Sequence, residues 1–346
     1  MKKAKIYIQA AEQVSVQVPL SREWMKNPIL HHSMHERSIE PDYKAFLSPL
    51  EARRMGKLLK RALVTSLAVI RESGVEHPDA VITGTGLGCI ENTELLLNAL
   101  NEDGEQLLKP THFMQSTHNT ISSLISIQTK THGYNVTYSH KGISFDSALM
   151  DAWNQFQLDM VHSALVGGHD EMTPSYFKLL QKIGFVGQDN ELCGETAVSI
   201  MLNNEVQDGL CILSGFKLMY KPDLERLKEG LLNMLNKAGI SLRDVDAVMT
   251  GMSGNKVNDD CYHAVIPELF GDTPILHYKH IFGEGYTASG MGLYAAACCL
   301  FEGEIPSFLY LDPSKVQKSG PKYIVLFNQF EGKNYSFTLL EATCGK

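Results

Sequence analysis

The chain contains the same succession of segments twice, and this internal repeat constrains its fold more than any other feature. Residues 79–88 read DAVITGTGLG, and residues 246–255 read DAVMTGMSGN. Each segment follows a helical pattern that ends at a glycine, as helices often do. The two helical patterns cover residues 53–72 and 224–238.

The repeat continues downstream. VTYSHKG at 136–142 leads into a helix that ends near Phe156, and LHYKHIFGEG at 276–285 precedes a helical run at 291–301. We expect a strand and then a closing strand pair in each half. The expected single strands are 160–168 and 306–311, and the expected pairs are 197–202 with 211–216 and 323–328 with 335–340.

This order predicts mixed α/β layers around apolar, doubly buried strands. We expect one compact pseudo-twofold unit, with an N-terminal half at 1–205 and a C-terminal half at 206–346. A duplicated unit brings its equivalent strand-to-helix turns together. The turns at Ser139 and at Gly283-Glu284 should therefore face one cleft.

Composition narrows the class of protein. The 346 residues are 44% hydrophobic and 20% charged, which is ordinary for a soluble globular chain. A net charge of −8 argues against nucleic-acid binding. Seven cysteines without a CxxC motif indicate a reduced, cytoplasmic protein.

The sequence also argues against a membrane span, a signal peptide and a metal site. No apolar stretch reaches the ~18–20 residues of a membrane span. Polar residues interrupt the N-terminal segment, so it predicts a strand or hairpin and not a signal peptide. His31, His32 and His35 lie in a loop-like segment without a second group of ligands, so we expect neither a metal nor a cofactor.

The turn at Ser139 is the first candidate site. A strand that turns sharply into a buried helix is a favoured place for a nucleophile, because the helix N-terminus stabilises developing negative charge. Ser139 stands at such a turn, in the run TYSHKG.

From about Met55 onward the chain resembles the β-ketoacyl synthases of the thiolase fold. The resemblance implies a duplicated five-layer α-β-α-β-α architecture. The motifs that carry it are GTGLG at 84–88, the elbow at 137–142, GGHDE at 167–171, GETAVSIML at 194–202, KHIFGEGYTASG at 279–290 and NQFEGKN at 328–334.

The family condenses acyl chains with a Cys-His-His triad, and the resemblance implies where each group falls in this chain. Ser139 occupies the cysteine position, Gly251 the first histidine position and Glu284 the second. The motif lysine is Lys279, and the gating phenylalanine is Phe330.

All three triad groups are therefore missing. A serine hydroxyl is far less acidic than a thiol and is a poor nucleophile without a base. Gly251 has no proton donor, and an ionised Glu284 opposes an enolate. No cysteine lies between Cys89 and Cys193, so a small shift of the alignment does not restore the nucleophile. We expect no condensation by this chain alone.

The first functional hypothesis is a chain-length-factor-type subunit. In type II fatty-acid, polyketide and aryl-polyene-like systems, such a factor lacks the triad and completes the acyl tunnel of an active ketosynthase. Phe113, Met114 and the run 121–127 correspond to the family's interface and tunnel region, although such residues are more often core. The expected partner is an active ketosynthase in a heterodimer, with a homodimer as the alternative.

An acyl carrier protein is the second expected partner. Carrier proteins are acidic, and a basic cluster on one helix provides a complementary surface. Its members are Arg54, Lys57, Lys60 and Arg61. A solvated helix face is the simpler explanation of the same residues.

Two alternatives stay open at this point. In the first alternative, Ser139 is the nucleophile of an acyltransferase or thioester hydrolase, activated by His140 or through water by Glu284. We prefer a structural role in which Ser139 caps the following helix. In the other, GTGLG binds a nucleotide, but the third glycine of GxGxxG is absent and tight turns account for the others.

Overall fold

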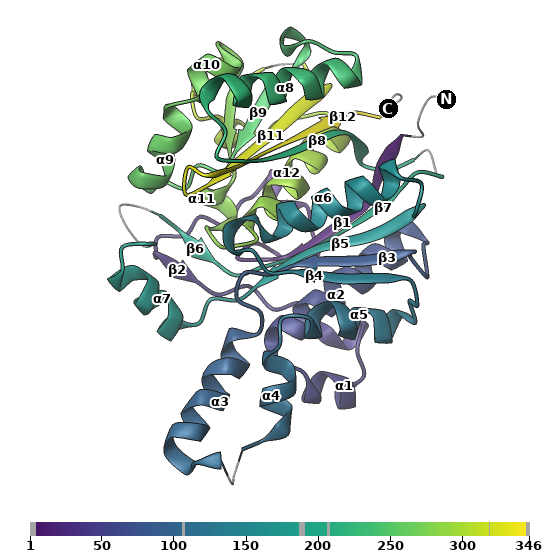
Figure 1. Cartoon of the computed structure of the whole chain (residues 1–346), viewed down its shortest axis with the longest axis vertical. Coiled ribbons are helices and arrows are strands. Elements are labelled where there is room, and N and C mark those ends of the chain that lie inside the picture. The colour runs from purple at the N-terminus through teal and green to yellow at the C-terminus, as the bar shows by residue number, and fades with distance from the viewer. Residues whose placement is uncertain (1–4, 106–107, 187–190, 206–207, 318, 344–346) are drawn as a thin grey trace.

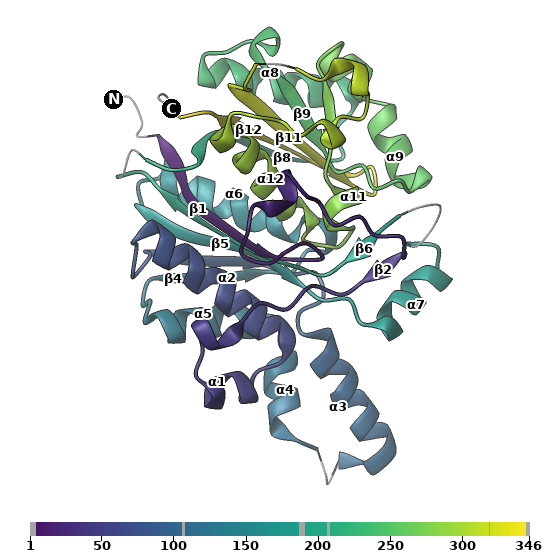
Figure 2. The same cartoon turned by 180° about the vertical axis from the view of Figure 1, so that it is seen from behind.

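The computed structural model describes residues 5–343, apart from 106–107, 187–190, 206–207 and 318. None of the helices in this described part is long and apolar enough to cross a membrane. Figures 1 and 2 show the chain from opposite sides.

A ten-stranded sheet runs through the molecule in the order β10-β9-β11-β12-β8-β1-β7-β5-β3-β4. The first half contributes β1 Ile6–Val14, β3 Ala80–Gly84, β4 Tyr134–Tyr138, β5 Ser163–Asp170 and β7 Thr196–Asn203. The second half contributes β8 Cys211–Tyr220, β9 Ala247–Thr250, β10 Ile275–His277, β11 Tyr323–Phe330 and β12 Asn334–Glu341.

The pairing pattern confirms the repeat. β3 lies parallel to β4 and β5, and β7 lies antiparallel to β5 and β1. The second half repeats this arrangement: β9 lies parallel to β10 and β11, and β12 lies antiparallel to β11 and β8. The boundary after residue 205, which falls between β7 and β8, stays a proposal.

One expected strand pairing and one expected strand are wrong. Segment 211–216 does not pair with 197–202, because β1 lies between β7 and β8 and pairs with both. Segment 306–311 is not a strand but contains a 3-10 turn at Ser307–Leu309, which follows Pro306. The counterpart of β5 in the second half is therefore β11, and the counterpart of β7 is β12.

The elements form the five layers that the resemblance implied, as Figure 1 shows. α2 (Lys57–Ser73) and α5 (Thr120–Thr129) cover the outer face of the first half. α8 (Leu224–Ala238) covers the outer face of the second, with α9 (Lys256–His263) and α10 (Ile266–Phe270) beside it. α6 (Ser144–Gln157) and α12 (Ala288–Glu302) lie between the half-sheets.

Local sequence explains these layers. α2 and α8 bury one face each and end at left-handed glycines, Gly74 with φ +71° and Gly239 with φ +78°. α12 is buried from Ala288 to Leu300, and its many Gly, Ala and Cys residues let both half-sheets approach it closely. This apolar, small-residue helix is the centre of the core.

The inserts between equivalent strands carry the remaining elements. α3 (Ile90–Asp103) and α4 (Pro110–Ser116) extend away from the body in both views (Figures 1 and 2). The other elements are α1 Pro49–Arg54, α7 Pro174–Lys182, α11 Lys279–Phe282, and a small parallel sheet of β2 His35–Glu36 with β6 Cys193–Gly194.

Candidate functional site

The turn after β4 is the predicted nucleophile elbow. A 3-10 turn at Lys141–Ile143 follows it and leads into α6. The residue at the cap position is His140, without a capping side chain. Instead the backbone N–H of His140 donates to Oγ of Ser144, 2.8 Å away. The prediction that Ser139 caps the helix is therefore wrong, because the turn begins one residue later.

Ser139 itself is exposed. Its hydroxyl has no hydrogen-bond partner among the residues that the structure describes. The left-handed residue of the turn is Lys141, with φ +48°, and not Ser139. In a nucleophile elbow the nucleophile itself occupies the strained backbone position. Ser139 does not occupy that position here, so the turn does not have the geometry of a nucleophile elbow.

A pocket of about 360 Å³ lies between the two halves, next to this turn. Gly142 from the first turn and Glu284 from the second both line it, so the two turns share one cleft as expected. Lys279 and Phe330 line it too, whereas Ser139 and Gly251 are absent from the lining. Apolar side chains make up much of the wall: Met172, Leu180, Phe185, Val186, Val257 and Tyr286.

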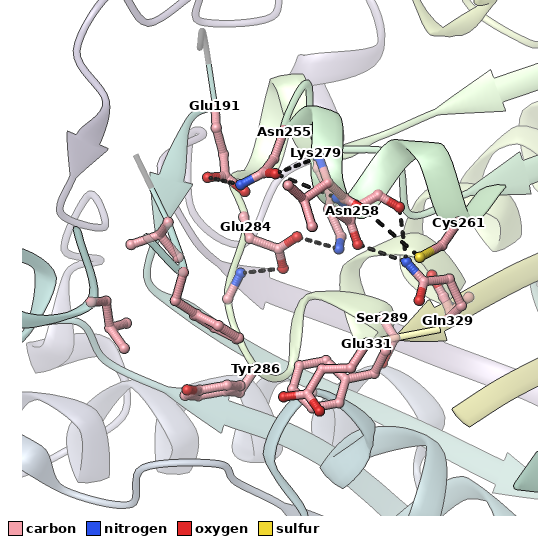
Figure 3. A pocket seen from close by; sticks show the side chains of 18 of the residues that line it. Glu191, Asn255, Asn258, Cys261, Lys279, Glu284, Tyr286, Ser289, Gln329 and Glu331 are labelled. Carbon is pink, nitrogen blue, oxygen red and sulfur yellow. Dashed lines mark hydrogen bonds and ion pairs between the residues drawn. The ribbon is translucent and has the colours of Figure 1, made fainter. Parts of the chain in front are cut away.

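Lys279 and Glu284 form an ion pair inside this pocket. Nζ of Lys279 lies 2.6 Å from Oε2 of Glu284. Oε1 of Glu284 accepts from the backbone N–H of Gly285 at 2.9 Å. Figure 3 shows the two side chains pointing toward each other. The second histidine position thus holds a carboxylate whose charge is compensated by the motif lysine.

The first histidine position has no room for a side chain. A Cβ placed on Gly251 lies 2.5 Å from the hydroxyl of Tyr262 and 2.7 Å from Oδ1 of Asn328. Tyr262 is fully buried, and its hydroxyl accepts from the backbone N–H of Gln329 at 3.0 Å. Tyrosine and asparagine side chains therefore occupy the space that a histidine needs.

Gly251→Ala is expected to lower the free energy of unfolding by about 1–3 kcal/mol, the usual cost of overpacking a closed site. Urea unfolding measures the loss. The double variant Gly251→Ala/Tyr262→Phe, which removes the clashing hydroxyl, should lose less than the sum of the two single variants. Strict additivity of the two losses, or a fully stable Gly251→Ala, would contradict this account of the site.

A network of amides surrounds the ion pair, and the sequence reasoning missed it. Nε2 of Gln329 donates to Oδ1 of Asn258 at 2.7 Å. Nδ2 of Asn255 donates to Glu191 at 3.2 Å (Figure 3). The signal was present in the run GNKVND that follows Gly251, since Asn255 and Asn258 lie there. The third amide is that of Gln329, which precedes Phe330.

Phe330, which the resemblance implies as the gating phenylalanine, lines the pocket. A Cβ on Gly142 meets the ring of Phe330 at 2.2 Å, so only glycine allows this close approach. The ring also packs against Phe185 and Tyr286, with centroids 6.1 and 6.3 Å away. The three rings form one side of the pocket next to the elbow.

The GTGLG loop holds a carboxylate of its own chain. The backbone N–H groups of Gly86 and Leu87 donate to Asp170 at 2.9 and 2.8 Å. The Thr85 hydroxyl donates to it as well, at 2.8 Å. Burial raises the pKa of Asp170 to about 6, although these hydrogen bonds favour its charged form. The donors that a nucleotide phosphate needs are thus already occupied.

Only some residues of the basic cluster lie at the protein surface. Arg54 is exposed, and Lys57 and Lys60 are half-buried. Arg61 is 1% exposed, and its guanidinium pairs with Glu195 at 2.9 Å and with Glu40. The assignment of Arg61 to a carrier-binding surface is therefore wrong, because its charge is buried and paired inside the protein.

Phe113 and Met114 lie on α4 and are 63% and 67% exposed. In the run 121–127, Ile121 and Ile125 are buried, whereas Ile127 is 72% exposed on α5. The run is thus partly core and partly surface.

The described residues contain no group of three or more His, Cys, Asp or Glu side chains arranged to hold a metal ion. His35, which lies in β2, stacks on Phe177, with ring centroids 4.8 Å apart.

Comparisons with known proteins agree with this arrangement. The family described as "Beta-ketoacyl synthase, N-terminal domain" matches residues 22–213. No curated protein sequence matches the chain.

Solved structures share the thiolase-like fold at low identity. The ishigamide ketosynthase/chain length factor matches with a TM-score of 0.81 and 16% identity, over 98% of this chain and 99% of that chain. A ketosynthase (ApeO) in complex with its chain length factor (ApeC) from Xenorhabdus doucetiae matches with a TM-score of 0.76 and 16% identity, over 98% of both chains.

A third match is AntDE:AntF, a type II polyketide synthase acyl carrier protein in complex with its ketosynthase. Its TM-score is 0.77 and its identity 12%, over 98% of this chain and 99% of that chain. The family match covers more than half of the sequence, and the fold agrees over almost all of it. This chain therefore belongs to the β-ketoacyl synthase family.

Proposed function

We propose that the chain is a non-condensing subunit that pairs with an active ketosynthase and acts as its chain-length factor. The proposal rests on the three positions that hold the catalytic triad in the family, because none of them has kept its catalytic group. Gly251 is closed by Tyr262, Glu284 is neutralised by Lys279, and Ser139 lies outside the pocket. The scaffold is complete, and an acyl tunnel wall needs shape and apolar lining without any nucleophile.

The open edge of the sheet supports a partner of the same fold. In β4, the N–H of Tyr134 donates to Asp79 and the carbonyl of Tyr138 accepts from Thr85, so both residues face β3. Backbone groups alternate along a strand, and Asn135 and Thr137 therefore present theirs outward. An unpaired edge of this kind is a template for a strand of another chain.

The other end of the sheet is closed. β10 has three residues, and a segment outside the named strands covers it: Leu276 bridges to Tyr310, and the N–H of Leu311 donates to Ile275 at 2.9 Å. The edge at β4 is thus the one we assign to the partner.

An apolar surface adjoins this edge and favours a protein partner. Phe113 and Met114 on α4 and Ile127 on α5 are exposed, and α5 packs against β4. α3 adds Leu95, Leu97 and Leu100, all at least 41% exposed. Contiguous exposed apolar side chains mark interaction surfaces. We assign this surface to the partner ketosynthase and to the far end of its acyl tunnel.

For an acyl carrier protein, we keep Arg54, Lys57 and Lys60 as the proposed contact, without Arg61. Structures of similar fold include ketosynthase–chain length factor complexes and one type II polyketide ketosynthase with its carrier protein, which supports a pathway of the type II polyketide kind. A fatty-acid or aryl-polyene-like pathway is part of the same proposal and rests on the family resemblance. No observation favours the alternative in which Ser139 is an acyltransferase or hydrolase nucleophile.

Co-expression with an intact Cys-His-His ketosynthase from the same genome tests the proposal. We expect the two chains to co-purify as a stable heterodimer when only one carries an affinity tag. If the chain forms only a homodimer while that ketosynthase is present, the proposed function is wrong.

A further inference from the structure

A buried carboxylate lies on α6, the helix that packs against the edge strand β4. Asp151 is 8% exposed, and its Oδ1 accepts from Nε2 of Gln155 at 3.2 Å. Its Oδ2 is buried without a hydrogen-bond partner among the described residues, and none of the ion pairs that these residues form includes it. A buried carboxylate without a cation is costly, so a donor from another chain would stabilise it.

Two tyrosines place Asp151 over the middle of β4. Side chains alternate along a strand, so Tyr134, Val136 and Tyr138 share one face. Nδ2 of Asn135 donates to a backbone carbonyl of α5 at 3.0 Å, and the tyrosines therefore lie on the opposite face, toward α6. Burial and the charge of Asp151 raise the pKa of both tyrosines, to about 12 for Tyr138. A carboxylate that acts on both of them lies near Val136, the middle residue of the strand.

A second copy of this chain would bring its own Asp151 to the same place. Two copies that pair through β4 are related by a two-fold axis, and their β4 strands run antiparallel. The register that joins the outward backbone groups of Asn135 in one copy to those of Thr137 in the other sets Val136 opposite Val136. The axis then passes the middle of β4, with one Asp151 carboxylate on either side. Like charges that face each other across an interface oppose association.

A ketosynthase of the same fold can carry a different residue opposite Asp151. A lysine, an arginine or a neutral donor there pairs with the carboxylate and supplies the hydrogen bond that Oδ2 lacks. The same carboxylate thus has opposite effects on the two kinds of pair.

We propose that Asp151 selects the partner at the β4 edge. It opposes a second copy of this chain, and it accepts from a basic or hydrogen-bond-donating side chain of the ketosynthase. The identity of that partner rests on the proposed function, whereas the opposition to self-pairing is a property of this chain alone.

Asp151→Asn removes the charge and keeps an oxygen that accepts from Gln155, so we expect it to fold. Sedimentation equilibrium should give at least about tenfold tighter self-association for this variant than for the unaltered chain, because facing like charges cost that much or more. Asp260→Asn is the matched control. It removes the same charge from an exposed residue of α9, in the second half, and should leave self-association unchanged.

The complex with the ketosynthase should respond in the opposite direction. Asp151→Asn should weaken it by about tenfold or more, because a hydrogen bond to a charged group contributes about that much. A variant that is merely unstable would weaken both kinds of pair, and thermal unfolding checks that each variant folds.

Equal self-association of Asp151→Asn and the unaltered chain would overturn the proposal even if the ketosynthase co-purifies. A ketosynthase complex that stays equally tight in Asp151→Asn would overturn it as well. If no ketosynthase co-purifies but Asp151→Asn still self-associates more tightly, the proposed function is wrong and the opposition to self-pairing is confirmed.

Discussion

Met114→Glu is expected to weaken the complex between this chain and the proposed partner ketosynthase by roughly 100-fold. The side chain is 67% exposed on α4 in the proposed interface, so a charge there costs little in the free chain. In the complex the same charge is desolvated against an apolar partner surface, and changes at such central residues cost ~2–4 kcal/mol. Calorimetry or surface plasmon resonance with the purified ketosynthase measures the affinity.

Ile183→Glu is the matched control for this change. Ile183 is also an exposed apolar residue, 75% accessible, but it follows α7 outside the proposed surface. It should leave the affinity unchanged. An equal loss of affinity in both variants would mean that α4 is not the interface.

A second pair of variants tests the strand edge. Thr137→Pro removes an outward N–H of β4 and should weaken the complex strongly, because edge strands tolerate proline only where that N–H has no partner. Thr137→Ala loses the same hydroxyl contacts to Thr83 and Ser122 but keeps the N–H, and should retain binding.

We expect the isolated chain to form no condensation product from acyl and malonyl carrier substrates, and we expect Ser139→Cys to leave this unchanged. A thiol at that residue still faces a closed Gly251 position and a Glu284 that Lys279 holds in an ion pair. Mass spectrometry of the carrier-bound products is the measurement. Elongated chains from Ser139→Cys alone would contradict the assignment.

A complex reconstituted from this chain and the proposed partner ketosynthase allows a sharper test, because the nucleophile positions of the two subunits can be compared. Ser139→Ala in this chain should leave the condensation rate within about twofold, because the hydroxyl takes no part in the chemistry. Replacing the nucleophilic cysteine of the partner ketosynthase should lower the rate by roughly 1000-fold or more. A large loss with Ser139→Ala would instead assign acyl chemistry to this chain.

The repeat was visible in the sequence because each element carries its own local signal. The helices at α2 and α8 show an apolar face and a terminal glycine, and the buried strands β3 and β9 are mostly apolar. These signals identify elements but not their neighbours. The insertion of β1 between β7 and β8 depends on contacts between distant segments, which local patterns do not encode.

The candidate site was likewise predicted only in part from the sequence. The repeat predicted that Ser139 and Glu284 face one cleft, and the resemblance implied Lys279 and Phe330 as site residues. Lys279, Glu284 and Phe330 line the pocket, whereas Ser139 does not. The burial of Arg61 was missed because spacing relative to Lys57 and Lys60 does not give the direction of a side chain. Arg61 shares the face of α2 that carries Leu58 and Thr65, and that face lies against the sheet.

The place of β1 in the sheet has a consequence for how the chain is made. β1 ends at Val14, but its two neighbours begin at Thr196 and Cys211. During synthesis β1 cannot pair until both of these neighbours have been made, and pairing across such sequence separations is slow. Deleting β1 removes the strand that joins the two half-sheets.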